Sequence, residues 1–504
     1  MSRSPFVALS AVLLFATANP ADAARSIVDR NYDCKIIAST REFPGGPDWL
    51  GPPAMNAWGQ VVFEAFTTVG VDTVQELRVG RGDQVGGVPV SHVVAKGGES
   101  FTGPLAPFGS LEEGAIDDTA RVTFLAYLPS STGGGQGIYR VFSNHPATVK
   151  PDPLFADQNI DLTSPYLGFD PLDTLQSNRA GSVLFQGITD TGVAYFRDDI
   201  EVARNYSSGI QIVNAPVLLH ADRPWTAFLA SLDTPLGGQA LLVNGVQLAA
   251  SQTGAGGFAV GGFAALSLSG NGTAVVAYSR SGFPGIDTWE LVTTSTLGTN
   301  VLVDADVDPF ERSGAPLDTS INVWGEVAFI SSPIGDGDTL LVADGSQQIS
   351  RVNCQNQDAI FGASFFDLVL SPHGINADGQ IAFEGKTFAH RFLVRADPLP
   401  GQGAPPTSCA GQLEGARCDD GDPITQSSCQ AGVCRGNPLY DPPTSCIGSA
   451  NHAACNDGDP ATISTCEDGV CVGIPLPVPE PTATSLVIAA LFGLASLRRA
   501  RSTR

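Results

Sequence analysis

The sequence predicts an all-β protein: a seven-bladed β-propeller, closed by an N-terminal strand and followed by a small duplicated disulfide-rich module. Three observations predict this class. An eight-residue phrase that ends in an aromatic residue recurs at intervals of 43 to 61 residues. Gly and Pro number 57 and 36 of 504 residues, as expected where many turns join short strands. Eight of the ten cysteines lie between residues 409 and 471.

Residues 1–23 have the features of a secretory signal peptide. Arg3 supplies a positive charge, an apolar run from Phe6 to Ala18 follows, and Ala21-Asp22-Ala23 matches the small-residue cleavage site. The run is shorter than the roughly 20 residues that a membrane-spanning helix needs. We therefore expect residues 1–23 to be removed during export.

Residues 24–399 contain the repeated phrase, Asn-x-x-Gly-x-Val-Ala-Phe. The clearest copies are Asn56–Phe63, Asn178–Phe185, Asn322–Phe329 and Asn376–Phe383, and the degenerate copies are Asp117–Phe124, Ala221–Phe228 and Asn271–Tyr278. Asn or Asp at the first place and Gly at the fourth favour a type I turn, and the alternating apolar residues that follow favour a strand. Further apolar runs give four short strands per unit, which is typical of a propeller blade. An array of β-sandwiches is the alternative.

The two ends of the repeat region are complementary. The seventh unit stops at Phe392–Asp397 without its last strand, and the orphan run Lys35–Ala38 precedes the first unit. We expect Ile36–Ala38 to pair with Phe392–Val394, because this pairing removes an open sheet edge. Cys34 and Cys354 lie at this strand and at the end of unit six, and they either pair or remain two sheltered thiols.

Residues 400–474 form a cysteine-rich module of two repeats, 409–434 and 446–471. The cysteine spacings of 9, 11 and 5 residues occur in both repeats, at positions Cys409, Cys418, Cys429, Cys434, Cys446, Cys455, Cys466 and Cys471. Each repeat is too short for a hydrophobic core, so we expect two disulfides within each, with three pairings open. Zinc is the alternative, but the module has no CxxC motif.

The C-terminal residues 475–504 have the composition of a sorting signal. Val478-Pro479-Glu480-Pro481 is followed by an uncharged run, 482–497, and then by basic residues that include Arg498 and Arg499. This order resembles the PEP-CTERM signal of bacterial surface proteins. The resemblance implies an exosortase-type membrane processing enzyme as partner and a transient inner-membrane anchor formed by residues 482–497. The protein would then be released or re-attached at the cell surface; a permanent anchor is the alternative.

The repeated phrase resembles a second family, the bacterial extracellular proteins with NxxGxxAF tandem repeats. That resemblance covers most of residues 24–399, and the family has no known activity that can be transferred to this chain.

Candidate sites for ligands are few. Asp304, Asp306 and Asp308 alternate as calcium ligands can, but Pro309 follows them and the turning Gly of a calcium loop is missing, so a solvated acidic loop is the alternative. We predict no metal or cofactor, with calcium the one candidate. Arg81-Gly82-Asp83 spells an adhesion tripeptide but lies in a turn-rich stretch.

Composition and motifs restrict the function. Asp and Glu number 51 against 27 Lys and Arg, so the chain would be repelled by a nucleic-acid backbone. The six histidines are not paired, and no catalytic motif is present, so we assign no catalytic residue. We expect an exported, non-catalytic cell-surface or extracellular-matrix protein whose propeller is a structural or binding platform. The alternative is a secreted propeller hydrolase or lyase that acts on extracellular polysaccharide.

Overall fold

The computed structural model describes the chain between residues 27 and 475 in segments: 27–40, 47–69, 72–85, 88–98, 108–129, 134–143, 153–169, 175–177, 181–204, 210–212, 217–219, 225–232, 239–243, 246–250, 259–269, 272–281, 287–295, 298–304, 316, 318–331, 338–344, 348–355, 365, 367–371, 373–399, 409, 418, 425–430, 433–438, 454–455, 462–467 and 470–475. All elements in these segments are strands, which confirms the all-β prediction. The signal peptide, and the sorting signal from residue 476 onward, lie outside them. Within the described segments, no helix has the length and apolar character to cross a membrane.

Each of the first five repeat units forms its own antiparallel sheet. Unit one contains β2 (Trp49–Leu50), β3 (Ala54–Met55), β4 (Val61–Val69), β5 (Asp72–Val85) and β6 (Val88–Gly97). Unit two contains β7 (Ser110–Ile116), β8 (Arg121–Tyr127), β9 (Gln136–Phe142) and β10 (Phe155–Ala156). Unit three contains β11 (Gly168–Phe169), β12 (Gln176–Ser177), β13 (Val183–Thr189), β14 (Gly192–Arg197) and β15 (Ile200–Arg204).

Units four to seven follow the same order. Unit four contains β16 (Ile210–Ile212), β17 (Val217–Leu219), β18 (Trp225–Leu232), β19 (Gln239–Val243) and β20 (Val246–Ala250). Unit five contains β21 (Ala259–Leu268), β22 (Ala274–Ser281), β23 (Asp287–Ser295) and β24 (Gly298–Asp304). Unit six contains β25 (Thr319–Ile321), β26 (Val327–Ser331), β27 (Thr339–Ala343) and β28 (Ile349–Cys354). Unit seven contains β29 (Asp367–Val369), β30 (Ile381–Lys386), β31 (Arg391–Pro398) and the N-terminal β1 (Val28–Ser39).

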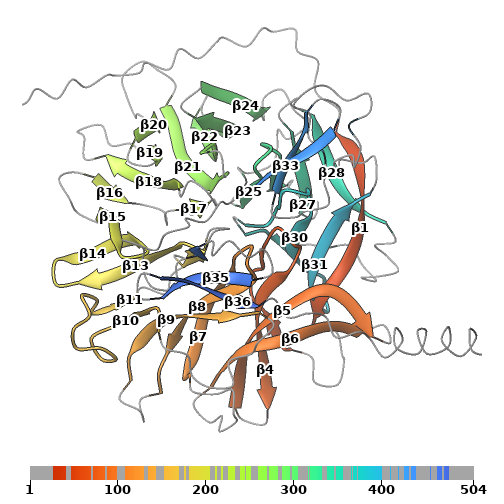
Figure 1. Ribbon diagram of the computed structural model, residues 1–504. Coiled ribbons are helices and arrows are strands. Elements are labelled where there is room, and N and C mark those ends of the chain that lie inside the picture. The colour runs from red at the N-terminus through yellow and green to blue at the C-terminus, as the bar shows by residue number, and fades with distance from the viewer. Residues whose placement is uncertain are drawn as a thin grey trace, which may run out of the picture.

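The sheets lie side by side around a common centre in a β-propeller-like arrangement (Figure 1). The strands that precede the phrase turn contact one another in consecutive units, as β12 contacts both β7 and β17, and β21 contacts both β17 and β25. The phrase strands are buried on both faces. In β26, Phe329 belongs to a core shared with unit five, and Ala328 belongs to a core shared with unit seven. This double burial explains why the phrase is continuously apolar where a one-sided strand would alternate with polar residues.

The N-terminal strand completes unit seven as expected. β1 pairs antiparallel with β31, with Ile36 opposite Val394 and Ala38 opposite Leu393, so the predicted pairing is confirmed, with an irregularity in register between Ile36 and Ala38. An additional pairing was not expected: residues 28–32 of β1 run parallel to β28. Units six and seven therefore share one eight-stranded sheet.

The structure corrects the register of the phrase in unit five. The expected copy began at Asn271, which lies outside the described residues. The turn instead begins two residues earlier, because Gly272 N donates to Ser269 O and Ser269 N donates to Thr273 O. Ser269 therefore has the place that Asn has in other units. Val276, rather than Tyr278, has the place of the final aromatic residue.

The cysteine-rich module consists of two related hairpins. The first pairs β32 (Thr425–Gln430) with β33 (Val433–Pro438), and the second pairs β35 (Thr462–Glu467) with β36 (Val470–Pro475), with β34 (Ala454–Cys455) added to its edge. The registers correspond, since Cys429 lies opposite Cys434 and Cys466 lies opposite Cys471. The structure thus supports the internal duplication.

Candidate functional site

The repeated phrase forms a turn that is closed by its own Asn side chain. In unit one, Gly59 N donates to Asn56 O at 3.1 Å. The Oδ1 atom of Asn56 accepts the backbone N–H groups of Trp58 at 3.1 Å and Gln60 at 3.0 Å. Asn322 and Asn376 make the same bonds in units six and seven. This use of an Asn side chain as a local acceptor explains the first place of the phrase.

The fourth place of the turn has a left-handed backbone. The φ angles are 66° at Gly59, 84° at Gly181, 80° at Gly272, 83° at Gly325 and 72° at Gly379. Only glycine adopts such angles without a steric penalty from Cβ. Among the turns that the structure describes, unit two is the exception, because Ala120 has this place with a φ of 59°.

The fifth place pairs with the first. Asn56 Nδ2 donates to Gln60 Oε1 at 2.9 Å, and Asn322 Nδ2 donates to Glu326 Oε2 at 2.7 Å. Unit two has an ion pair instead, in which Arg121 Nε lies 2.9 Å from Asp117 Oδ2. The repeated phrase leaves the fifth place unspecified, because Gln, Glu and Arg differ in charge. The joint change of the first and fifth places in unit two, to Asp and Arg, is the sequence signal that could have revealed this pairing.

The turns of four consecutive units are hydrogen-bonded to one another. Asn322 Nδ2 donates to Asn376 O at 3.1 Å, Asn376 Nδ2 donates to Asn56 O at 3.3 Å, and Asn56 Nδ2 donates to Asp117 O at 3.0 Å. We call the four turns, residues 322–325, 376–379, 56–59 and 117–120, the turn arc. The same amide therefore closes one turn and fixes the position of the next.

Arginine side chains from the third strands add to these links. Arg395 Nη1 donates to Gly59 O at 2.6 Å, while Nε and Nη2 bind the carboxylate of Asp397. Arg140 donates in the same way to Gly181 O. Burial, and to a smaller extent the positive charge of Arg121, lower the pKa of Arg140 to about 10. Its guanidinium therefore stays protonated at neutral pH.

Two tryptophan indoles lie at the surface of the turn arc. Trp58 has the third place in unit one and is 44% exposed. Its Nε1 donates to Asp118 O at 2.6 Å, and Trp324 Nε1 donates to Ala377 O at 3.1 Å in the corresponding way. Trp324 is partly exposed. The third places of the other two turns are Asp378 and Thr119, so two aromatic rings and two polar side chains share equivalent positions on this surface.

Carboxylates gather near the other ends of the strands in units six and seven. Asp338 Oδ2 accepts Leu368 N at 2.9 Å and Asp318 Oδ2 accepts Leu370 N at 3.2 Å, so both position β29. Burial, together with the charges of Asp367 and Asp338, raises the pKa of Asp318. Burial likewise raises the pKa of Glu384, which lies 3.0 Å from Arg391 Nη1. These carboxylates are engaged in strand positioning and ion pairs.

The remaining sites expected from sequence are placed only in part. Asp304 ends β24, whereas Asp306 and Asp308 lie outside the described residues, so calcium binding there stays a prediction. Among the described residues, one group has metal-ligand proximity, Cys409, Cys418 and Cys434, and its sulfurs are in disulfides. Gly82 has a φ of +81°, and a Cβ there would lie 2.7 Å from Lys35 Cβ. The glycine of the Arg81-Gly82-Asp83 tripeptide is thus required for packing against β1.

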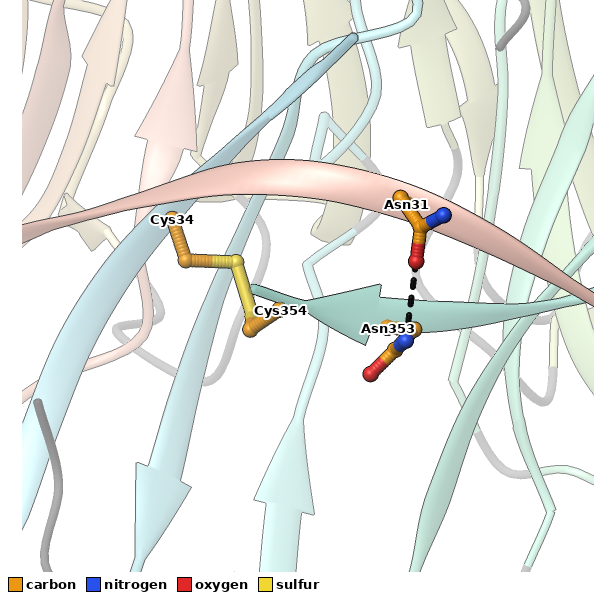
Figure 2. Close-up of a disulfide and its surroundings, with 4 residues drawn as sticks. All are labelled: Asn31, Cys34, Asn353 and Cys354. Atoms are coloured by element: carbon orange, nitrogen blue, oxygen red, sulfur yellow. Dashed lines mark hydrogen bonds between the residues drawn. A yellow bond between two sulfur atoms is a disulfide. The ribbon is translucent and has the colours of Figure 1, made fainter. Parts of the chain in front are cut away.

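Disulfides resolve two questions that the sequence left open. Cys34 and Cys354 are bonded, with Cα atoms 5.4 Å apart, and this bond joins β1 to β28 (Figure 2). Beside it, Asn353 Nδ2 donates to Asn31 Oδ1 at 2.9 Å. In the first cysteine repeat, the bonds are Cys409–Cys429 and Cys418–Cys434. The first cysteine therefore pairs with the third and the second with the fourth.

Comparison with known proteins identifies no family. No family model matches the chain, and no curated protein is detectably similar. Solved structures with some likeness include a prolyl endopeptidase, at 11% identity and a TM-score of 0.38, covering 70% of this chain and 50% of that chain. Prolyl oligopeptidase B from Galerina marginata has 10% identity and a TM-score of 0.36, covering 61% of this chain and 42% of that chain. Regucalcin, a calcium-binding protein from Agrobacterium tumefaciens, has 10% identity and a TM-score of 0.28, covering 74% and 97%.

This chain spans half or less of the two peptidases, 50% and 42% of their lengths. All three TM-scores are below 0.5, so these likenesses carry no argument about what the chain binds or catalyses.

Proposed function

We propose that this protein is an exported, non-catalytic component of the cell surface or extracellular matrix, and that its repeat region is a rigid platform. The observation that carries the proposal is the use of the repeated polar residues. The Asn side chains of the phrase, and the Arg395 side chain of a neighbouring strand, bind adjacent turns. The disulfides support an oxidising, extracellular environment.

The platform is a closed seven-bladed propeller in this proposal. Closure is supported by the links from unit seven to both neighbours: Asn376 and Arg395 donate to the turn of unit one, and β1 joins unit seven to unit six. Electron microscopy of the purified chain should resolve a disc of seven blades. A row of separate sheets without contact between units one and seven would contradict closure.

Sorting through the C-terminal signal belongs to the same proposal. The motif at Val478–Pro481, the apolar run and the arginine cluster would direct an exosortase-type enzyme to the chain. Mass spectrometry of the exported protein should find the chain truncated near Pro481. Recovery of intact residues 485–504 would contradict processing.

The direct test of a non-catalytic role is incubation of the purified protein with extracellular polysaccharide. Polymer length, measured by size-exclusion chromatography with light scattering, should not change. A fall in polymer length would favour the secreted hydrolase or lyase. Substitutions Asp318→Asn and Glu384→Gln would then show whether the carboxylates in units six and seven take part.

A further inference from the structure

We propose that the turn arc binds a neutral polysaccharide chain, with the indoles of Trp58 and Trp324 stacked against its sugar rings. The inference deepens the proposed platform function and rests on it, because an exported protein meets such polymers outside the cell. It names the surface of the platform that makes contact and the chemical class of its ligand.

The first observation is the exposure of a large aromatic side chain with a fixed orientation. Trp58 is 44% exposed, although its indole could bury far more apolar surface in a core. The bond from its Nε1 to Asp118 O, at 2.6 Å, holds one ring edge against the next turn. Since the indole is already oriented, stacking of a ligand on it costs little conformational entropy of the Trp58 side chain. The face of a pyranose ring carries C–H groups that suit the negative face of an indole.

The second observation is that the same arrangement recurs two units away. Trp324 has the same place in its turn, and its Nε1 bonds the next turn at Ala377 O, 3.1 Å away. The Asn amides of units six and seven link the turns that carry these two rings. A single sugar can cover one indole, whereas an extended chain can cover both. Two such contacts along one chain strengthen each other through a high effective concentration.

The charge of the protein selects among polymers. The chain has a formal net charge of −24, and the turn arc itself contains Asp118 and Asp378. A polyanion such as alginate would be repelled at low ionic strength, whereas a neutral glucan would not. The side-chain oxygens of Asp378 and Thr119, at the third places between and beside the indoles, can accept hydrogen bonds from sugar hydroxyls.

The test is binding of the full exported chain to a soluble neutral β-glucan, measured by affinity gel electrophoresis and by calorimetry with defined oligosaccharides. We expect a hexasaccharide to bind at least about tenfold more tightly than a disaccharide. Trp58→Ala and Trp324→Ala should each weaken binding about tenfold, and Trp58→Phe, which keeps an aromatic face, should weaken it less. Alginate of matched length should not bind.

A control and a gain-of-function variant make the result independent of folding defects. Trp49 is 36% exposed and pairs with Phe66, toward the end of β4 away from the turn, so Trp49→Ala should leave binding unchanged. Asp378→Trp places a third indole in the turn between the two existing ones and should tighten binding several-fold. Thermal melting shows that each variant is folded.

Three outcomes would overturn the inference. The wild-type chain does not bind neutral glucan, the Trp58→Ala and Trp324→Ala variants bind it as tightly as the wild type, or the wild type binds alginate more tightly than neutral glucan. None of them would affect the proposed non-catalytic platform. That proposal fails on a different readout, a decrease in polymer length.

Discussion

Cys34 and Cys354 are joined by a disulfide across β1 and β28, the parallel strand pair that unites units six and seven in one sheet. The two residues are 320 positions apart in the chain. The bond is buried, since each cysteine is only 5% exposed. It therefore joins the first described strand of the chain to the sixth unit covalently, while the same strand completes the seventh unit through backbone hydrogen bonds.

Removing this disulfide should destabilise the whole repeat region. A crosslink between distant residues restricts the unfolded chain, and its loss typically costs about 2–5 kcal/mol. Cys34→Ser with Cys354→Ser should lower the free energy of unfolding by that amount in urea denaturation. Hydrogen exchange should accelerate first in residues 28–39. The control variant Cys409→Ser with Cys429→Ser, in the separate module, should leave the unfolding transition of the repeat region unchanged. If this control destabilised the repeat region equally, the effect would not be specific to the Cys34–Cys354 bond.

The fourth place of the turn offers a reciprocal test of backbone strain. Ala120 has a φ of 59°, a left-handed conformation that costs an L-residue roughly 1–2 kcal/mol. Glycine removes this strain, but the greater entropy of glycine in the unfolded chain offsets part of the gain. Ala120→Gly should therefore stabilise the protein by roughly 0.5–1 kcal/mol. Gly325→Ala should destabilise it by about 1 kcal/mol through backbone strain, because a Cβ at Gly325 would meet no atom within 4 Å. Thermal denaturation measures both; changes of the same sign would contradict the strain argument.

The second cysteine repeat should have the disulfide pairing of the first. The spacings of 9, 11 and 5 residues are the same, and Cys466 faces Cys471 as Cys429 faces Cys434. We expect Cys446–Cys466 and Cys455–Cys471, although Cys446 lies outside the described residues. Peptide mapping under non-reducing conditions identifies the linked peptides. A Cys446–Cys455 peptide would show that the duplication does not extend to connectivity.

The sequence was sufficient to predict those features that depend on local periodicity. The turn at Asn56–Gly59 and the strand after it follow from Asn, Gly and the apolar residues that come next, and the pairing of Ile36 with Val394 follows from a missing strand. The parallel pairing of β1 with β28 was not predictable in this way. Its residues, Val28 to Tyr32, are mostly polar, because this part of β1 is less buried than its continuation. A search for apolar runs therefore begins only at Lys35.

The turn arc was harder to predict than the fold. The links between turns join atoms of different units, such as Asn376 Nδ2 and Asn56 O, and sequence spacing contains no information on which units are adjacent in space. Trp58 and Trp324 occupy a variable place of the phrase. Their shared orientation depends on a hydrogen bond to a backbone carbonyl of the next unit, which any residue supplies.

The buried carboxyl group of Asp318 predicts that stability increases on mild acidification. Burial and the charges of Asp367 and Asp338 raise its pKa in the folded state above its ordinary value. Its contribution to stability is therefore fully present below the unfolded-state pKa and is lost as the pH rises through the folded-state pKa. Asp318→Asn keeps an acceptor for Leu370 N and removes the charge. This variant should have a higher Tm than the wild type at pH 7, and the difference should disappear as the wild-type carboxyl is protonated.

Asp161 provides the matched control with the opposite sign. Hydrogen bonds from Thr163 lower its pKa, so its contribution is present above the unfolded-state pKa and is lost as the pH falls. Asp161→Asn should therefore lower the Tm slightly at pH 7, and the difference should again vanish in acid. Differential scanning calorimetry between neutral and acidic pH measures both variants. If Asp318→Asn lowered the Tm at pH 7, the charge of Asp318 would contribute more to holding β29 than its burial costs.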